Sequence, residues 1–187
     1  MSTTPRSFER RAAVITTPNT PFTFVITDCP SDNDLAQYAD YLLGHGIKNV
    51  VRACNASSYD GAALEKSYGI KVYDMEFEDG SVPSPAILDD FRRLVKTVAS
   101  SPGENAIAVH CISGLGRAPV LVACALVDDG LDPVEVATVI RKHRRGALNK
   151  KQLQWLLDGG ASKGTKGVKL KGSVMNFLGF KNKGTKA

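Results

Sequence analysis

The segment that most constrains the fold is residues 106–127, where two apolar stretches flank a short loop with two glycines. The first stretch, Ala106 to His110, has the length and composition of a buried strand. The second, Pro119 to Val127, is almost wholly apolar and suits a central helix. A strand and a helix that are apolar on every side need cover on every side. We therefore expect this unit at the centre of a layered α/β core.

The rest of the chain alternates between strand and helix patterns. Further strands are expected at 22–27, 49–53 and 70–73, and helices at 35–43, 60–68, 84–98, 132–143 and 149–157. Capping residues and glycines at the ends of these segments support the boundaries. The order predicts a central, mostly parallel sheet flanked by helices, with the chemistry at the carboxyl ends of the strands.

The 187 residues suffice for one ordinary domain. We expect a flexible leader at 1–20, a single domain at 21–158 and a basic, disordered tail at 159–187. Residues 161–187 contain seven lysines and no acid, which leaves 17 basic against 19 acidic residues in 1–160. The positive net charge of +5 therefore comes from the lysines of the tail. This uneven distribution of charge argues against a globally basic nucleic-acid-binding domain.

The cysteines and the apolar pattern indicate the compartment. No apolar run is long enough for a membrane span and the N-terminus lacks a signal-peptide pattern, so we expect a cytoplasmic protein. Cys29, Cys54, Cys111 and Cys124 are widely spaced and form no CxxC pair. We therefore expect free thiols, with neither a disulfide framework nor a metal site, and no cofactor.

The loop of residues 110–117, His-Cys-Ile-Ser-Gly-Leu-Gly-Arg, predicts phosphate chemistry. A loop of this kind can turn its backbone N–H groups inward around an anion, and the following helix adds its positive end. Both effects stabilise a thiolate on Cys111, while Arg117 offers a planar fork for two phosphate oxygens. His110 is expected to be a buried support for the loop. The phosphate-binding residues are then Ile112, Ser113, Gly114, Leu115 and Gly116.

A phosphocysteine route also needs a general acid on an opposing loop. Asp79 precedes Cys111 in the chain and stands next to Gly80, in a loop that also contains Pro83 and Pro85. A glycine-flanked position of this kind suits a mobile loop that reaches a pocket. Three other carboxylates in the same region remain alternatives, namely Asp74, Glu76 and Glu78.

The motif HCISGLGRAPVLVACAL resembles the phosphatase of regenerating liver (PRL, type IVA) family of protein tyrosine phosphatases, and so do FVITDCPSD, GIKNVVRACNASSYD, FEDG and VIRKHRRGALNKKQL. The similarity covers about residues 22–158. It implies a dual-specificity-phosphatase-like fold with a Cys-x5-Arg loop, in which Cys111 is the nucleophile, Arg117 binds phosphate and Asp79 is the acid. Ala118 stands where many relatives have Ser or Thr, which implies slow turnover.

The resemblance also implies regulation and partners. Cys54 matches a second cysteine that forms a reversible disulfide with the nucleophile, and Arg144 and Arg145 match a basic rim that contacts acidic or phosphorylated partners. Phosphoproteins are the implied substrates, and magnesium transport mediators of the cyclin M (CNNM) type are an implied partner. Two other functions stay open: a binding module of low activity for such a partner, and a phosphoinositide phosphatase.

Two features depart from the family pattern. Met75-Glu76 stands where the family has Trp-Pro, and no cysteine lies beyond Cys124, so no prenylation motif is present. The lysine-rich tail interleaves apolar residues, which is consistent with peripheral binding to an anionic membrane as well as with disorder.

Overall fold

A computed structural model describes residue 8 and residues 11–162, and its core is a five-stranded sheet. The strands are β1 (Ala13–Thr16), β2 (Thr23–Thr27), β3 (Asn49–Arg52), β4 (Lys71–Asp74) and β5 (Ala106–His110). Their order is β1-β2-β5-β3-β4. Strand β1 pairs antiparallel with β2, whereas β2, β5, β3 and β4 are parallel. The predicted mostly parallel sheet is confirmed.

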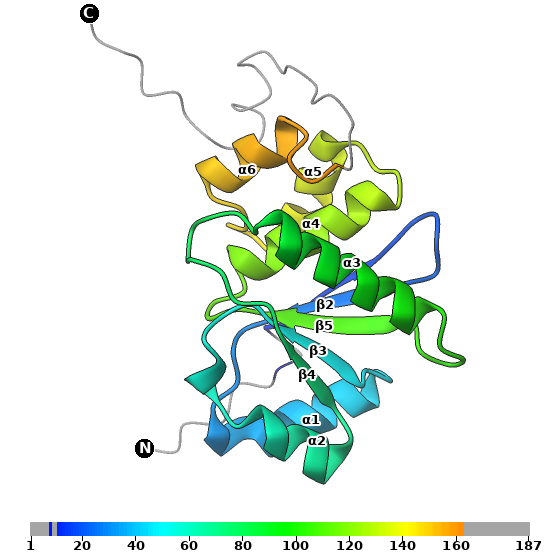
Figure 1. Cartoon of the computed structure of the whole chain (residues 1–187), viewed down its shortest axis with the longest axis vertical. Coiled ribbons are helices and arrows are strands. Elements are labelled where there is room, and N and C mark those ends of the chain that lie inside the picture. Colours follow the sequence, from blue (N-terminus) through cyan, green and yellow to red (C-terminus); the bar gives the residue numbers. More distant parts are fainter. Residues whose placement is uncertain (1–7, 9–10, 163–187) are drawn as a thin grey trace, which may run out of the picture.

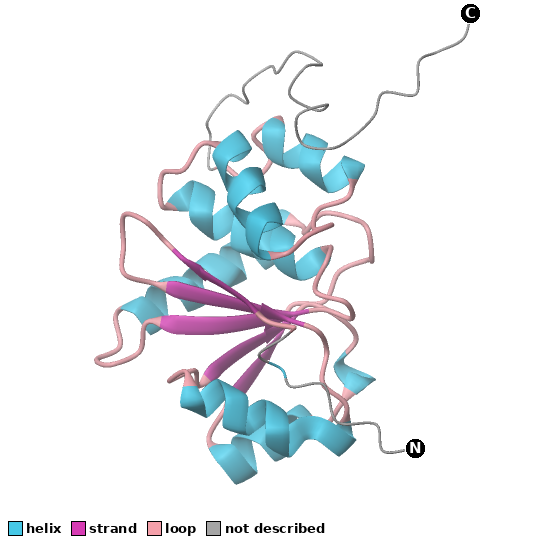
Figure 2. Cartoon of the chain, turned by 180° about the vertical axis from the view of Figure 1, so that it is seen from behind, coloured by secondary structure: helices cyan, strands magenta, loops and turns pink. Residues whose placement is uncertain are grey.

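Helices cover both faces of the sheet (Figure 1). One face carries α1 (Leu35–Gly44) and α2 (Gly61–Tyr68), and the other carries α3 (Pro85–Ala99), α4 (Arg117–Asp128), α5 (Pro133–His143) and α6 (Lys150–Leu157). The view from behind shows the same three layers (Figure 2). Side-chain caps start most of these helices as predicted, for example Ser84 at α3 and Asn149 at α6.

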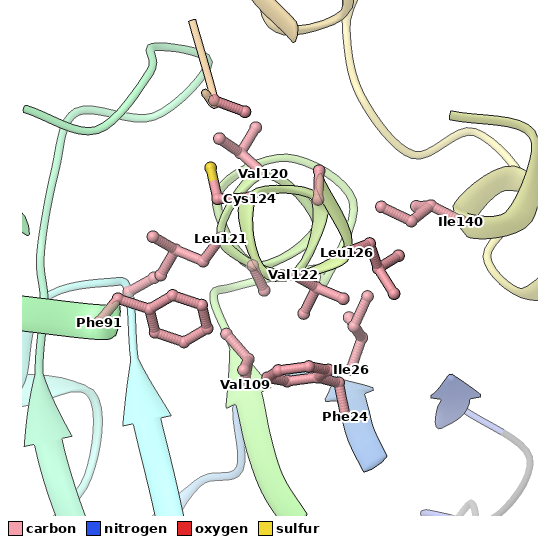
Figure 3. Close-up of a cluster of buried hydrophobic side chains, with 14 of the residues drawn as sticks. Phe24, Ile26, Phe91, Val109, Val120, Leu121, Val122, Cys124, Leu126 and Ile140 are labelled. Carbon is pink, nitrogen blue, oxygen red and sulfur yellow. The ribbon is translucent and has the colours of Figure 1, made fainter. Parts of the chain in front are cut away.

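The centre of the larger core is α4, which Figure 3 shows along its axis. Apart from the half-buried Ala125, every residue from Arg117 to Leu126 is buried. Around it pack side chains of β2, β5, α3 and α5, namely Phe24, Ile26, Val109, Phe91 and Ile140. Burying one such large apolar side chain contributes about 2 kcal/mol, so α4 is held firmly. The loop before it is thereby anchored by β5 at one end and α4 at the other.

The structure corrects the boundary of the leader. Residues 13–16, placed by the sequence in a loose leader, form strand β1 at the sheet edge, with Val14 paired opposite Val25. Ala13 and Ile15 are buried whereas Val14 is 41% exposed, the alternation of a half-buried edge strand. At the other end the description reaches Ser162, so most of the predicted tail lies outside the described residues. Among the helices described, none is both long and apolar enough to cross a membrane.

Candidate active site

The loop from Ile112 to Gly116 connects the carboxyl end of β5 to the first residue of α4. Cys111, at its start, is buried, while Ile112 and Leu115 are 56% and 38% exposed. Within the described residues, the backbone N–H groups of 112–116 have no protein acceptor. Free amides next to a helix N-terminus make an anion site. The structure therefore brings the predicted loop residues together beside Cys111.

Position 114 requires glycine for two reasons, namely its backbone conformation and the lack of space for a side chain. Its φ is +64°, a left-handed value that costs an L-residue about 1–2 kcal/mol. A Cβ at this position would lie 2.6 Å from the carbonyl oxygen of Thr27 and 2.5 Å from Nη2 of Arg144. Glycine thus lets the loop lie directly against β2 and α5.

Arg144 supports the loop from behind. Its Nε donates to the Gly114 carbonyl at 3.0 Å and its Nη2 to the Ser113 carbonyl at 2.7 Å. The same guanidinium pairs with Asp28 and donates to the Arg11 carbonyl. The side chain is 11% exposed, so Arg144 is not the outward rim residue that the family pattern implies, whereas Arg145 is exposed. Arg144 fixes the loop through its carbonyls, which leaves the amides for a ligand.

Arg117 and Asp79 meet above the loop. Nε of Arg117 lies 3.3 Å from Oδ1 of Asp79, and Nη1 donates to the Phe77 carbonyl at 3.3 Å. The Arg117 side chain is 8% exposed and that of Asp79 is 78% exposed. The Nε–H of Arg117 is buried and has no hydrogen-bond acceptor among the residues that the structure describes, because the 3.3 Å approach of Asp79 lacks hydrogen-bond geometry. A buried, unsatisfied guanidinium N–H is costly, and a bound oxyanion would satisfy it.

The other carboxylates of the acid loop face elsewhere. Asp74 forms a two-pronged pair with Arg52, at 2.5 and 3.1 Å. Glu76 is exposed and 3.5 Å from the Asn55 amide, and Glu78 is also exposed. Of the four candidates, Asp79 is the one beside Arg117. Met75, which replaces the family's tryptophan, is buried in the core.

The start of α6 holds the acid loop in place. Nδ2 of Asn149 donates to the Gly80 carbonyl and Nε2 of Gln152 to the Ser81 carbonyl, both at 2.9 Å. Gln152 is fully buried and approaches Gly116, where a Cβ would lie 3.3 Å from its Nε2. The sequence predicted a helix that starts at Asn149 and indicated no contact of Asn149 or Gln152 with the acid loop. The one sequence feature that joins these two residues is the capping box that they form at the start of α6.

His110 is completely buried beneath the loop. Its Nε2 lies 2.9 Å from the Tyr59 hydroxyl, and its Nδ1 lies 3.4 Å from the Cys111 carbonyl oxygen and 4.0 Å from Sγ of Cys54. This is the supporting position expected for it. Ala118, the second residue of α4, is also fully buried.

Cys54 has a neighbour that the family pattern does not predict. Its sulfur lies 3.9 Å from Sγ of Cys29, and Ser58 and His110 are its other described polar contacts. The hydrogen bond with Cys29 and the contact with His110 lower the pKa of Cys54, although burial opposes them. The disulfide of Cys54 with Cys111 stays a prediction. Cys124 faces the core, and burial raises its pKa.

Comparison with known proteins places this geometry in a family. Residues 30–131 match the family model described as "Tc-R-P: Polymorphic toxin system, DSP-PTPase phosphatase". Mouse protein tyrosine phosphatase type IVA 2 is 44% identical over 133 residues, which are 71% of this chain and 78% of that protein. The chain belongs to the type IVA (PRL) family of protein tyrosine phosphatases.

Solved structures of protein phosphatases share the fold of this chain. A putative protein tyrosine phosphatase from Leishmania major is 38% identical and superposes with a TM-score of 0.66, over 78% of this chain and 96% of that one. Kinase-associated phosphatase, at 21% identity, superposes with a TM-score of 0.68 over 79% and 92% of the two chains, and shows the same fold. The phosphatase fold is therefore shared beyond the PRL family.

Proposed function

We propose that this chain is a cysteine-dependent protein tyrosine phosphatase in which Cys111, Arg117 and Asp79 carry the reaction. The observation that carries the proposal is the buried guanidinium of Arg117, at the end of the loop that begins at Cys111. Its Nε–H lacks an acceptor within residues 11–162 and lies 3.3 Å from the Asp79 carboxylate. These positions support a site in which the cation, the nucleophile and the acid act on one phosphoryl group.

The reaction follows from these positions. The Cys111 thiolate attacks phosphorus, the bond to the leaving oxygen breaks, and protonated Asp79 donates its proton to that oxygen. Arg117 and the loop amides hold the equatorial oxygens, where charge is spread in the transition state. Water then attacks the phosphocysteine, with Asp79 as its base. Thiolate and inorganic phosphate are released.

Ala118 limits the second step. It is fully buried and offers no hydroxyl to stabilise the departing thiolate. We therefore expect a fast first turnover followed by slow hydrolysis of the phosphocysteine.

Phosphotyrosine proteins are the proposed substrates. Ile112 and Leu115 present exposed apolar side chains at the loop, where an aromatic ring can pack. No basic residue lies between Cys111 and Arg117, which gives a phosphoinositide headgroup little extra charge to bind. The mouse relative is named a protein tyrosine phosphatase, which supports phosphotyrosine proteins as the substrate class.

A second candidate function is a binding module for an acidic or phosphorylated partner, such as a CNNM-type magnesium transporter. The missing hydroxyl at Ala118 and the Met75-Glu76 sequence of the acid loop favour it. Exposed Arg145 is then a partner contact. We propose that the protein acts in the cytoplasm in either case. We also propose that its lysine-rich tail contacts anionic membranes.

The test is pre-steady-state turnover of an aryl phosphate by the reduced full chain, followed by steady-state rates on phosphotyrosine and phosphoserine peptides and on phosphoinositide vesicles. We expect a burst of one equivalent per chain and a slow phase, both absent in Cys111→Ser. Ala118→Ser should accelerate the slow phase. Full activity of Cys111→Ser would refute the mechanism, and no burst in the reduced wild type would favour the binding module.

A further inference from the structure

Three potential metal ligands meet beneath the phosphate loop. Cys29 follows β2, Cys54 follows β3, and His110 ends β5. These strands are neighbours in the order β2-β5-β3 and run parallel, so their carboxyl ends share one edge of the sheet. The two sulfur atoms and a ring nitrogen of His110 all lie within 4.8 Å of one another. The fold thus brings together three potential ligands that are far apart in the sequence and form no CxxC pair.

We propose that Cys29, Cys54 and His110 form a binding site for a soft or borderline divalent cation, Zn²⁺ foremost. Two thiolates and an imidazole are the donor set that zinc prefers, and they disfavour magnesium and calcium, which take oxygen ligands. Three protein ligands leave a fourth position for water.

The distances are close to those that zinc requires. Tetrahedral coordination with Zn–S near 2.3 Å and Zn–N near 2.0 Å separates two sulfurs by roughly 3.8 Å and a sulfur from a nitrogen by roughly 3.5 Å. Here Sγ of Cys29 and Sγ of Cys54 are 3.9 Å apart, and Sγ of Cys54 is 4.0 Å from Nδ1 of His110. Sγ of Cys29 and a ring nitrogen of His110 lie within 4.8 Å of each other, so this third pair must move closest together when one ion is bound.

Tyr59 supplies the outer partner that a histidine ligand needs. Its hydroxyl lies 2.9 Å from Nε2 of His110. When Nε2–H donates to this hydroxyl, the lone pair of Nδ1 is free for the metal, the arrangement found around most histidine ligands. Binding then releases to solvent any thiol proton that Cys29 or Cys54 still carries. Cys29 is half-buried, so the site is reachable from outside.

The site contacts the first residues of the phosphate loop through the loop backbone. The backbone N–H of Cys29 donates to the Ile112 carbonyl at 3.0 Å, and Nδ1 of His110 lies 3.4 Å from the Cys111 carbonyl oxygen. An ion that holds both ligands therefore ties down the first two residues of the loop. It also takes Nδ1 away from the Cys111 carbonyl, so we expect bound metal to change the rate of the burst.

The test is a spectroscopic titration of the reduced, metal-stripped full chain with Co²⁺, followed by competition with Zn²⁺. A non-chelating phosphine keeps the thiols reduced. We expect one equivalent of cobalt, a thiolate-to-cobalt charge-transfer band and the visible bands of tetrahedral cobalt. Cys29→Ser should weaken binding at least tenfold. Without metal its burst should equal that of the metal-free wild type, because the backbone N–H that donates to Ile112 is kept. Tyr59→Phe should weaken binding about tenfold to a hundredfold.

Two controls separate this site from other thiols. Cys124→Ala removes a core cysteine and should leave the cobalt spectrum unchanged. Cys111→Ser removes the nucleophile and should also keep it, so loss of the spectrum in Cys111→Ser would assign the metal to the catalytic thiol and overturn the proposal. No charge-transfer band in the reduced wild type, or equal affinity in Cys29→Ser, would overturn it too. If the reduced protein shows no charge-transfer band and oxidation forms a Cys29–Cys54 disulfide, the cluster is a redox pair and the metal proposal is overturned.

Discussion

The Asp79 carboxylate lies 3.3 Å from Nε of Arg117, although Asp79 belongs to the acid loop and Arg117 is the first residue of α4, far away in the sequence. One side chain is largely exposed and the other is buried. The pair therefore joins a surface loop, which Asn149 and Gln152 hold at the next two residues, to the buried phosphate site at the start of α4.

Asp79→Asn should slow dephosphorylation of a substrate with a basic leaving group by about 10²- to 10⁴-fold, the usual contribution of a general acid. An aryl phosphate with a very acidic phenol needs no protonation, and its burst should change little. Stopped-flow rates on both substrates measure the contrast. Glu78→Gln is the matched control, since Glu78 is the exposed neighbour of Asp79 in the chain and should leave both rates unchanged. Equal loss on both substrates would assign Asp79 to binding.

Gly114→Ala should destabilise the protein by more than the left-handed backbone alone explains. The new Cβ would approach the rigid Thr27 carbonyl at 2.6 Å, so the loop must shift. Gly103 has a similar φ, +78°, with nothing within 4 Å, and Gly103→Ala should cost only about 1 kcal/mol. Urea unfolding of the two variants gives the comparison. Similar free energies of unfolding for both would show that the loop tolerates a side chain at 114.

Arg144→Met should lower the free energy of unfolding by about 2–4 kcal/mol, because it leaves Oδ1 of Asp28 and two loop carbonyls without their donor. Arg11 still pairs with Oδ2 of Asp28 at 3.3 Å. The looser loop should also bind phosphate more weakly, seen as a higher KM for an aryl phosphate. Exposed Arg145→Met serves as the control and should stay within about 0.5 kcal/mol of the wild type. A normal stability and KM for Arg144→Met would remove Arg144 from the support of the loop.

Cys124 should make the protein less stable at alkaline pH. Burial raises the pKa of its thiol in the folded state, so stability is complete below the unfolded pKa of about 8.5 and falls as pH rises above it, where only the unfolded chain ionises. The slope is about 1.4 kcal/mol per pH unit for one group. Urea unfolding between pH 8 and 10.5 should therefore show a shallower decline for Cys124→Ala than for the wild type. Parallel curves would contradict this.

Much of the fold was predictable because its signals are local. An apolar strand, a loop with two glycines and an apolar helix set the core at residues 106–127, and capping residues set the helix starts. The order of strands and helices favoured a parallel sheet. The edge strand at 13–16 was missed, because so short a segment near prolines and threonines makes a strand only when β2 offers a partner. Isolated pairs of short strands are marginal in water, so their formation depends on the rest of the sheet.

The sequence by itself determined the chemistry of this protein: a cysteine and an arginine fixed in one loop by five intervening residues, and a family whose motifs cover most of the chain. The tertiary structure alone decided what surrounds that loop. In the folded protein the buried Arg144 side chain donates to the carbonyls of the phosphate loop, and α6 places Gln152 against the acid loop. The parallel order β2-β5-β3 gathers Cys29, Cys54 and His110 at one edge. Such contacts join segments that are distant in the sequence, and no local pattern encodes them because they depend on which strands pair.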